Sequence, residues 1–231
     1  MIQAEAALLA RAPLPGRTEL WRLHAPEIAK AARPGHYIEV EVAASERLFV
    51  MRADAPAGWI ELLRPVTNSD APLTVGRSLA IRGPLGSEFV VHPERPRPLL
   101  LGHGLGMAPM IFLASALRGL PVFKPLALLS TDDAFPFTPR PSRIIVPGVP
   151  HGVIAAPPLL DDWGVPARLI NAHGAPGCHE GDLIALARHW LHALSPAQRG
   201  EVEIFVCAPP ILLAEICVWA QAERIVWQSC G

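Results

Sequence analysis

The segment with the clearest chemical potential runs from Leu99 to Met110 and reads LLLGHGLGMAPM. An apolar run typical of a buried strand leads into Gly102, Gly104 and Gly106, and a helical pattern follows. Glycines let the backbone approach an anion closely, and the free N–H groups at the start of a helix attract phosphate. The third glycine of the dinucleotide fingerprint GxGxxG is absent. The spacing alone is therefore as compatible with a structural tight turn as with nucleotide binding.

Two groups of histidine and cysteine residues could also take part in catalysis or ligand binding. His103 lies within the glycine turn, where it could contact a phosphate or carry a proton, but a structural role is the simpler interpretation. Cys178 and His179 are neighbours, and His173 is close by in the sequence. An activated thiolate needs a base, and a metal needs three or four converging ligands. Nothing in the sequence shows such convergence, so we predict a loop before a helix, and no metal site.

The four cysteines, at positions 178, 207, 217 and 230, include no Cys-x-x-Cys pair and no regular spacing. This pattern predicts neither a zinc site nor a disulfide framework. We therefore expect reduced thiols, with Cys207 and Cys217 as small buried apolar residues.

Charge and composition exclude several classes of partner. The formal net charge is −1, from 20 basic and 21 acidic residues, with no basic stripe. Nucleic acid and anionic membranes are therefore not expected partners. The first residues, MIQAE, lack a basic segment before a long apolar core, which predicts a cytoplasmic protein. The longest apolar stretch, residues 98–117, is interrupted by three glycines, so we predict a strand, a loop and a helix there and no membrane insertion.

The first half of the chain has the pattern of antiparallel strands. Short apolar runs alternate with turn residues, which is the spacing of a barrel or sandwich. Ile38 and Val40 alternate with Glu39 and Glu41, so we expect this strand to have one buried face and one solvent-exposed face. Strands are expected at Ala6–Ala10, Glu19–Leu23, Tyr37–Val42, Leu48–Arg52, Trp59–Leu63 and Ser78–Ile81.

The pattern changes after the proline-rich residues 93–98. Continuous apolar runs now alternate with helical patterns, which indicates a parallel sheet in an α/β domain. We predict a two-domain α+β protein with an antiparallel barrel in residues 1–96 and an α/β domain in residues 97–231. Residues 131–158 read as an irregular, proline-rich insertion, and helices are expected at 182–194 and 211–222. Strands are expected at Leu99–Leu101, Lys124–Ser130, Arg143–Val146, Ala167–Asn171 and Val202–Cys207.

Four segments, in the correct order, resemble motifs of the ferredoxin reductase superfamily of FAD- and NAD-binding proteins. They are the Pro-Gly entry in Ala32–Ile38, the Gly-Pro-Leu-Gly-x-x-Phe turn in Ile81–Phe89, the Gly-x-Ala-Pro turn in Leu99–Met110, and the late element Val206–Leu212. Within that superfamily the chain is most similar to the electron-transfer subunit of dihydroorotate dehydrogenase. Its members pass electrons from NADH through FAD and a [2Fe-2S] cluster to a partner flavoprotein.

The resemblance implies an antiparallel flavin-binding barrel, FAD as cofactor, NADH as electron donor and a second redox subunit as partner. Assembly into a homo- or hetero-oligomer is compatible with it. Asp132 and Asp133, after the second strand of the α/β domain, favour NADH over NADPH. The cofactor-binding residues that it implies are Arg47, Phe49, Val50, Gly83, Pro84, Leu85, Gly86, Gly102, Gly104, Gly106, Ala108, Pro109 and Cys207.

The chain departs from the family pattern in four places. Val50 stands where the flavin motif has a hydroxyl residue, and residues 66–70 contain no Gly-Thr for the flavin pyrophosphate. Ala208 replaces a glycine, and its methyl would intrude where backbone and nicotinamide approach closely. The chain has no four clustered cysteines, so we expect no iron–sulfur cluster on it.

Three hypotheses remain open. The first is an FAD-containing, NADH-oxidising electron-transfer subunit, because one lost hydrogen bond costs only about 0.5–1.5 kcal/mol. The second is a cofactor-free scaffold or regulatory subunit that retains the reductase fold. The third is that the chain is a shortened form of a protein whose full version carries the cluster.

Overall fold

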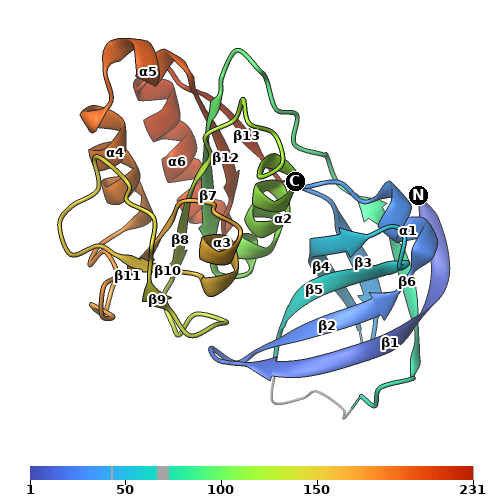
Figure 1. The fold of residues 1–231 in the computed structure, drawn as a ribbon. Helices are drawn as coiled ribbons and strands as arrows, with labels where there is room; N and C mark the ends of the chain where they lie inside the picture. The colour runs from blue at the N-terminus through green and yellow to red at the C-terminus, as the bar shows by residue number, and fades with distance from the viewer. Residues whose placement is uncertain (43, 67–72, 231) are drawn as a thin grey trace.

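The computed structural model describes residues 1–42, 44–66 and 73–230, and its first half is a closed antiparallel barrel. The strand order around the barrel is β1-β2-β5-β4-β3-β6 (Figure 1). The helix α1 (Pro26–Ala31) lies between β2 and β3 in the chain. The strands are β1 (Ile2–Leu14), β2 (Thr18–His24), β3 (Tyr37–Glu41), β4 (Ser45–Asp54), β5 (Trp59–Pro65) and β6 (Ser78–Leu85). The antiparallel barrel predicted from the spacing of apolar runs is confirmed.

The barrel closes around side chains that alternate along its strands. Ile38 and Val40 of β3 are fully buried, whereas Glu39 and Glu41 point away from this core, as their period of two predicts. Leu48 and Val50 of β4 are buried in the same core, together with Trp21 of β2. Phe49 between them is only half-buried. The alternation on β4 therefore sends Phe49 out of the barrel, toward the second half of the chain.

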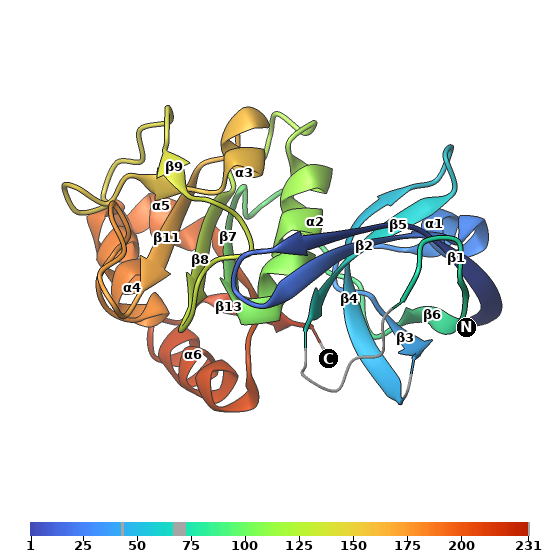
Figure 2. The ribbon, with the colours of Figure 1, turned by 90° about the horizontal axis from the view of Figure 1, so that it is seen from below.

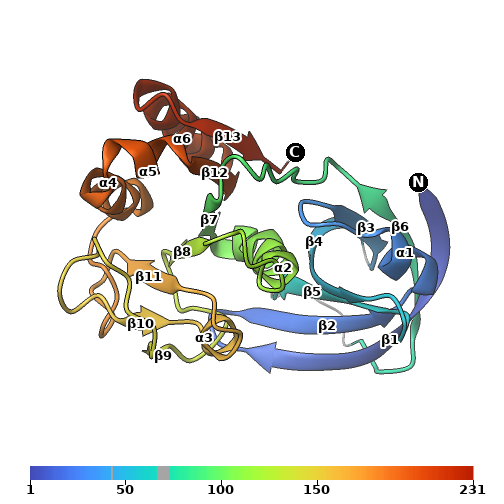
Figure 3. The same cartoon turned by 45° about the horizontal axis from the view of Figure 1, so that its top comes forward.

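The second half is an α/β unit around a parallel sheet of order β11-β8-β7-β12-β13. Two apolar clusters cover its two faces, one with α2 and α3 and the other with α4 and α6 (Figure 3). The strands are β7 (Arg97–His103), β8 (Leu126–Thr131), β11 (Ala167–Asn171), β12 (Val202–Cys207) and β13 (Val226–Ser229). The helices are the 3-10 turn η1 (Gly104–Gly106), α2 (Met107–Leu117), α3 (Pro158–Asp162), α4 (Leu183–Ala193), α5 (Pro196–Gly200) and α6 (Pro210–Ala222).

Helix α2 lies between the parallel sheet and the barrel (Figure 2). It is apolar on all sides, as expected of a helix that is buried on more than one face. Its residues Met110 and Ala114 belong to a cluster that also contains Met51 of β4 and Leu63 of β5. This shared cluster packs the two halves of the chain against each other. Among the described residues, no helix is both long and apolar enough to span a membrane.

The predicted strand at Arg143–Val146 is wrong. This segment is irregular and lies between the two short strands β9 (Arg140–Pro141) and β10 (Ala155–Ala156), which pair with each other. The buried carboxylate of Asp161 accepts hydrogen bonds from the Ser142 hydroxyl at 2.7 Å and from the Arg143 backbone N–H at 3.1 Å. Ile145 is 89% exposed. The β-branched residues of this run indicated a strand, but hydrogen bonds from the segment to the Asp161 side chain decide its conformation.

Glu19 of β2 leads to a prediction about acid stability. Its carboxylate, 5% exposed, accepts hydrogen bonds from Arg11 at 2.7 Å and from the Trp21 indole at 2.9 Å. The Arg11 hydrogen bond lowers the pKa of Glu19 below its usual 4.5, against the opposite effect of burial. Ionised Glu19 therefore stabilises the fold above about pH 4.5, and this contribution is lost as the pH falls through the lower folded pKa.

We therefore expect Glu19→Gln to lower the free energy of unfolding at neutral pH by about 1–3 kcal/mol. The difference between the variant and the original chain should shrink as the pH falls below the ordinary pKa of glutamate. Urea denaturation at a series of pH values measures this difference. A difference that stays constant with pH would contradict the assignment.

Candidate functional site

The candidate site lies at the carboxyl ends of the parallel strands. Along the chain, β7 is followed by β8 and β11 on one side of it in the sheet, whereas β12 and β13 lie on its other side. The order of the strands therefore reverses between β7 and β12. Ligands of open parallel sheets bind outside the carboxyl ends of the strands at such a switch point. Here the glycine turn after β7 meets the Cys207–Ala208 segment after β12.

Two cavities meet at this point. The turn cavity, of about 450 Å³, is lined by the glycine turn at 103–106, the acidic residues Asp132 and Asp133, and the segment 207–209. The sulfur cavity, of about 600 Å³, is lined by Arg47 of the barrel, by parts of α6 and by three cysteines. Phe49, Cys207 and Ala208 line both cavities. One ligand extending across both would thus contact both halves of the chain.

Gly104 and Gly106 of the turn are glycines for two different structural reasons. An added Cβ on Gly106 would lie 2.0 Å from the backbone oxygen of Cys207, so only glycine allows this contact between the two segments. Gly104 has φ +56°, and no atom lies within 4 Å of the position its Cβ would take. No side chain caps η1 or α2. The first N–H of α2, that of Met107, donates to the backbone oxygens of Gly104 and Leu105, so the N–H groups that a ligand could meet are those at the start of η1. The arrangement suits an anion. Ala108 and Pro109 are buried in α2 and serve packing.

His103 and the acidic residues lie at the rim of the turn cavity. The His103 Nδ1 atom lies 2.9 Å from the Ser130 hydroxyl, and its Nε2 atom lies 3.5 Å from an Asp132 carboxylate oxygen. The Asp132 side chain is 86% exposed and is free to contact a ligand. His103 thus has partners within the chain and also lines the turn cavity.

Of the residues predicted for the flavin, the structure brings Arg47 and Phe49 to the sulfur cavity but not Val50. The Arg47 guanidinium stacks on the Tyr37 ring at 4.3 Å, and the Tyr37 and Phe49 rings meet edge to face at 6.0 Å. Val50 is fully buried in the barrel core, so its side chain faces no ligand.

The residues Gly83–Gly86 line neither cavity. An added Cβ on Gly83 would lie 2.6 Å from Ile38, and Gly86, at φ +82°, lies against the Tyr37 ring. The peptide bond between Gly83 and Pro84 is cis. Because Tyr37 supports both Arg47 and Phe49, this turn affects the cavity through packing.

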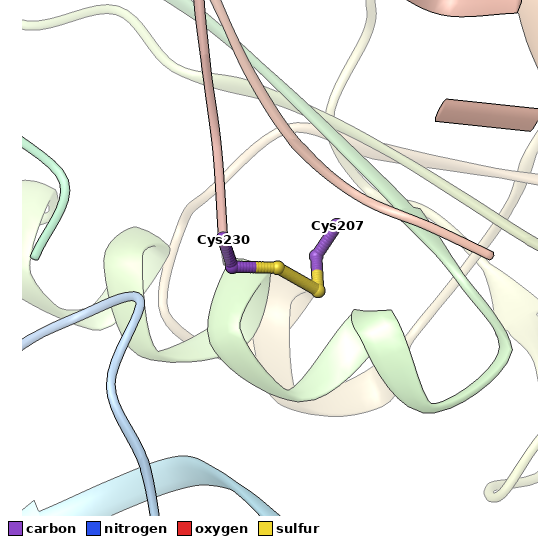
Figure 4. The surroundings of a disulfide bond; sticks show 2 residues. All are labelled: Cys207 and Cys230. Carbon is purple, nitrogen blue, oxygen red and sulfur yellow. A yellow bond between two sulfur atoms is a disulfide. The ribbon is translucent and has the colours of Figure 1, made fainter. Parts of the chain in front are cut away.

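The expectation of four reduced thiols is wrong, because Cys207 and Cys230 form a disulfide (Figure 4). The two residues are 23 positions apart, and their Cα atoms are 5.5 Å apart. They follow the paired residues Val206 and Ser229 at the ends of β12 and β13. Parallel neighbours end at the same edge of a sheet, which brings the sulfurs together. The sequence signal that could have shown this is the short apolar run Ile225–Trp227, which predicts a last strand but not its neighbour.

Cys178 and Cys217 are free, and burial raises the pKa of both thiols. Cys217 lines the sulfur cavity. The loop with Cys178 and His179 lies beside β11 through a bridge from His179 to Ile170, and Asp182 caps α4 through a 2.6 Å hydrogen bond from the Ala185 N–H. No cluster of three or more metal-ligating side chains occurs in residues 1–42, 44–66 and 73–230.

These features fit a dinucleotide and a flavin. The open, uncapped turn at Gly104 would hold a pyrophosphate, and Asp132 would accept from a ribose hydroxyl. The half-buried Phe49 ring between the two cavities offers a stacking surface for a flavin ring, with the Arg47 charge beside it.

No protein-family model matches this chain, and no curated protein sequence matches it. Solved structures do match. An NADH-dependent reduced ferredoxin-NADP oxidoreductase, studied for flavin-based electron bifurcation, has a TM-score of 0.71 and 16% identity over 98% of this chain and 75% of its own. A ferredoxin reductase in carbazole 1,9a-dioxygenase has a TM-score of 0.72 and 15% identity, covering 100% and 69%. The cytochrome b5 reductase domain of Ulva prolifera nitrate reductase has a TM-score of 0.67 and 14% identity over 99% of this chain and 97% of its own.

These likenesses establish the fold. The six-stranded antiparallel barrel followed by a parallel-sheet α/β unit is the two-domain fold of ferredoxin reductase-like proteins. The fold expected from the sequence is confirmed.

Proposed function

We propose that this chain is an electron-transfer flavoprotein that takes electrons from NADH through FAD and passes them to a partner redox protein. Its role would be like that of a dihydroorotate dehydrogenase electron-transfer subunit. The observation that carries the proposal is the convergence of Phe49 from the barrel, the uncapped turn at Gly104, and Cys207 at one switch point. A division into domains 1–96 and 97–231 accords with β6 ending at Leu85 and β7 beginning at Arg97.

The chain's own residues would mainly position the reactants. The N–H groups of the glycine turn bind the NADH pyrophosphate, and Asp132 selects the unphosphorylated ribose. Phe49 and Arg47 would hold the flavin ring at the entrance of the sulfur cavity. FAD, when bound, would supply the hydride acceptor and the means to pass electrons on. Because residues of the two adjoining cavities would hold donor and cofactor side by side, they would lower the entropic cost of bringing the two together.

The test is an absorption spectrum of the purified protein with and without added FAD, followed by NADH without oxygen. We expect bound flavin that bleaches with NADH. Protein that binds no FAD at tens of micromolar would favour the second candidate, a cofactor-free scaffold or regulatory subunit. Ala208, which lines both cavities and stands where the family pattern has a glycine, is the observation in favour of that candidate.

Two variants address the flavin residues directly. We expect Phe49→Ala to weaken FAD binding about tenfold or more, because a lost aromatic contact of this kind costs about 1.4 kcal/mol. Arg47→Ala should act in the same direction. Arg77→Ala removes an equal charge from an exposed position that lines neither cavity and is the control. FAD binding is measured by fluorescence quenching. Equal affinities in all three variants would contradict this placement of the flavin.

A further inference from the structure

The Cys207–Cys230 disulfide lies at the junction of the two cavities. Cys207 lines both of them, and its backbone oxygen is the atom that Gly106 approaches so closely. Cys230 lines the sulfur cavity together with Phe49 and Arg47. The disulfide thereby places an acceptor of two electrons beside the surface to which we assign the flavin.

The two cysteine residues differ in their exposure to solvent. Cys207 is 4% exposed, whereas Cys230 is half-buried. A molecule that enters from solvent therefore meets Cys230 more readily, and Cys207 stays on the side of the glycine turn. Thiol–disulfide exchange depends on access to the attacking sulfur. We therefore assign the exchange with an external disulfide to Cys230, and the step that closes the bond again to the buried Cys207.

Strand β13 has anchors other than the disulfide. It pairs with β12 from Val226 to Ser229, and the Cys230 N–H donates to the Val206 carbonyl oxygen at 3.2 Å. The Gln228 side chain accepts from the Val90 N–H at 2.9 Å and donates to the Glu203 carboxylate at 2.8 Å. After reduction the two thiols would remain neighbours, because these contacts do not involve sulfur. The disulfide can therefore open and close again without loss of the strand.

We propose that Cys207–Cys230 is a redox-active disulfide, reduced by NADH through the bound flavin and reoxidised by an external disulfide. This inference rests on the proposed function. In the first half, NADH and one proton are consumed, the S–S bond breaks, and NAD⁺ and two thiols are formed. In the second half, the Cys230 thiolate attacks the external disulfide and releases one thiol. The Cys207 thiolate then attacks the mixed disulfide, restores the Cys207–Cys230 bond and releases the second thiol.

Cys217 provides a matched control in the same cavity. It lines the sulfur cavity but is a free thiol on α6. Burial raises the pKa of Cys217, so it stays protonated near neutral pH and is a poor nucleophile toward the disulfide. The proposal therefore requires that Cys217→Ser retain the redox behaviour of the original chain and that Cys230→Ser lose it.

The test counts alkylated cysteines by mass spectrometry in the FAD-loaded full chain, which is kept without oxygen and then denatured in the alkylating agent so that buried thiols also react. Before NADH we expect labels on Cys178 and Cys217 only, and after excess NADH on all four cysteines. Bis(2-hydroxyethyl) disulfide should then restore the original labelling. A count that NADH leaves unchanged would overturn the proposal, as would a dithiol that persists in excess of this probe.

An anaerobic titration gives a second readout that separates this inference from the proposed function. Each disulfide takes two electrons beyond those held by the flavin. We expect full bleaching of the flavin in the original chain and in Cys217→Ser to need about two equivalents of NADH, and in Cys230→Ser about one. Flavin that bleaches with one equivalent in every form would leave the electron-transfer function standing and overturn the redox-active disulfide. Failure to bind FAD would instead remove the proposed function itself. Circular dichroism confirms that each variant is folded.

Discussion

Replacing Gly106 with alanine is expected to disrupt both the fold and the candidate site. The added methyl would lie 2.0 Å from the Cys207 backbone oxygen and 2.6 Å from its carbonyl carbon. Backbone atoms cannot move aside as a flexible side chain can, and Cys207 is also tied to β13 by the disulfide. Overpacking of this kind costs about 1–3 kcal/mol. Because the displaced segments line both cavities, we also expect the affinities for FAD and NADH to fall about tenfold or more.

Gly200→Ala is the matched control for this substitution. No atom lies within 4 Å of the position that a Cβ on Gly200 would take, and the residue ends α5 away from both cavities. Its effect on unfolding should stay within about 0.5 kcal/mol. Urea denaturation gives the free energies of unfolding, and fluorescence gives the affinities. Equal free energies of unfolding and equal affinities of Gly106→Ala and Gly200→Ala would contradict this prediction. The fold and the cavities would then not require the close approach of the glycine turn to Cys207.

The second large effect is expected at Glu203 of β12, which is fully buried. Its carboxylate lies 2.9 Å from the His92 Nδ1 atom and accepts a 2.8 Å hydrogen bond from the Gln228 side chain. Gln228 in turn pairs with the backbone of Val90 through both its oxygen and its nitrogen. Glu203→Ala would leave these donors without their acceptor and open a cavity. We expect it to lower the free energy of unfolding by about 2–4 kcal/mol.

Glu203→Gln distinguishes the loss of a hydrogen-bond acceptor from the loss of charge. The amide keeps one acceptor oxygen and nearly the same volume, so we expect less than half of the effect of alanine. Urea denaturation at neutral pH measures both variants. Equal free energies of unfolding for Glu203→Ala and Glu203→Gln would contradict this role. The network would then not be the interaction that joins the segment at Val90 and His92 to β12 and β13.

This network is relevant to function because residues 86–96 connect the two halves of the chain. Val90 and His92 lie in that connection and are held to the parallel sheet through Gln228 and Glu203. The cluster around α2 packs the barrel on the same sheet. We therefore expect Glu203→Ala to weaken FAD binding as well, since the sulfur cavity contains residues of both halves.

Several features followed from the sequence because their signals are local. The alternation of Ile38 and Val40 with glutamates predicts a half-buried strand wherever it lies in the fold. The apolar run before Gly102 and the helical pattern after Gly106 predict the strand, turn and helix that the structure contains. The reason is that strand period and glycine conformation depend on a few neighbouring residues. The anion-compatible turn and the order of the two folding units were predictable in this way.

Other features depended on contacts between distant segments. Val50 and Phe49 were both implied as flavin-binding residues, but the barrel core buries the Val50 side chain and only Phe49 points outward. Arg143 to Val146 has the composition of a strand, yet Asp161 binds this segment in another conformation. In both cases a local pattern competes with tertiary packing, and burial or a buried carboxylate contributes more free energy than intrinsic propensity does.

The two folding units, the parallel sheet of the second and the glycine turn between a strand and a helix could all be predicted from local patterns of residues. Phe49, the turn at Gly104 and Cys207 line adjoining cavities, and Cys207 bonds to Cys230, only because the folded chain brings distant segments together. The pairing of β12 with both β7 and β13 produces this arrangement. Strand neighbours in a parallel sheet are chosen by side-chain packing across the whole domain, which no local run of residues specifies.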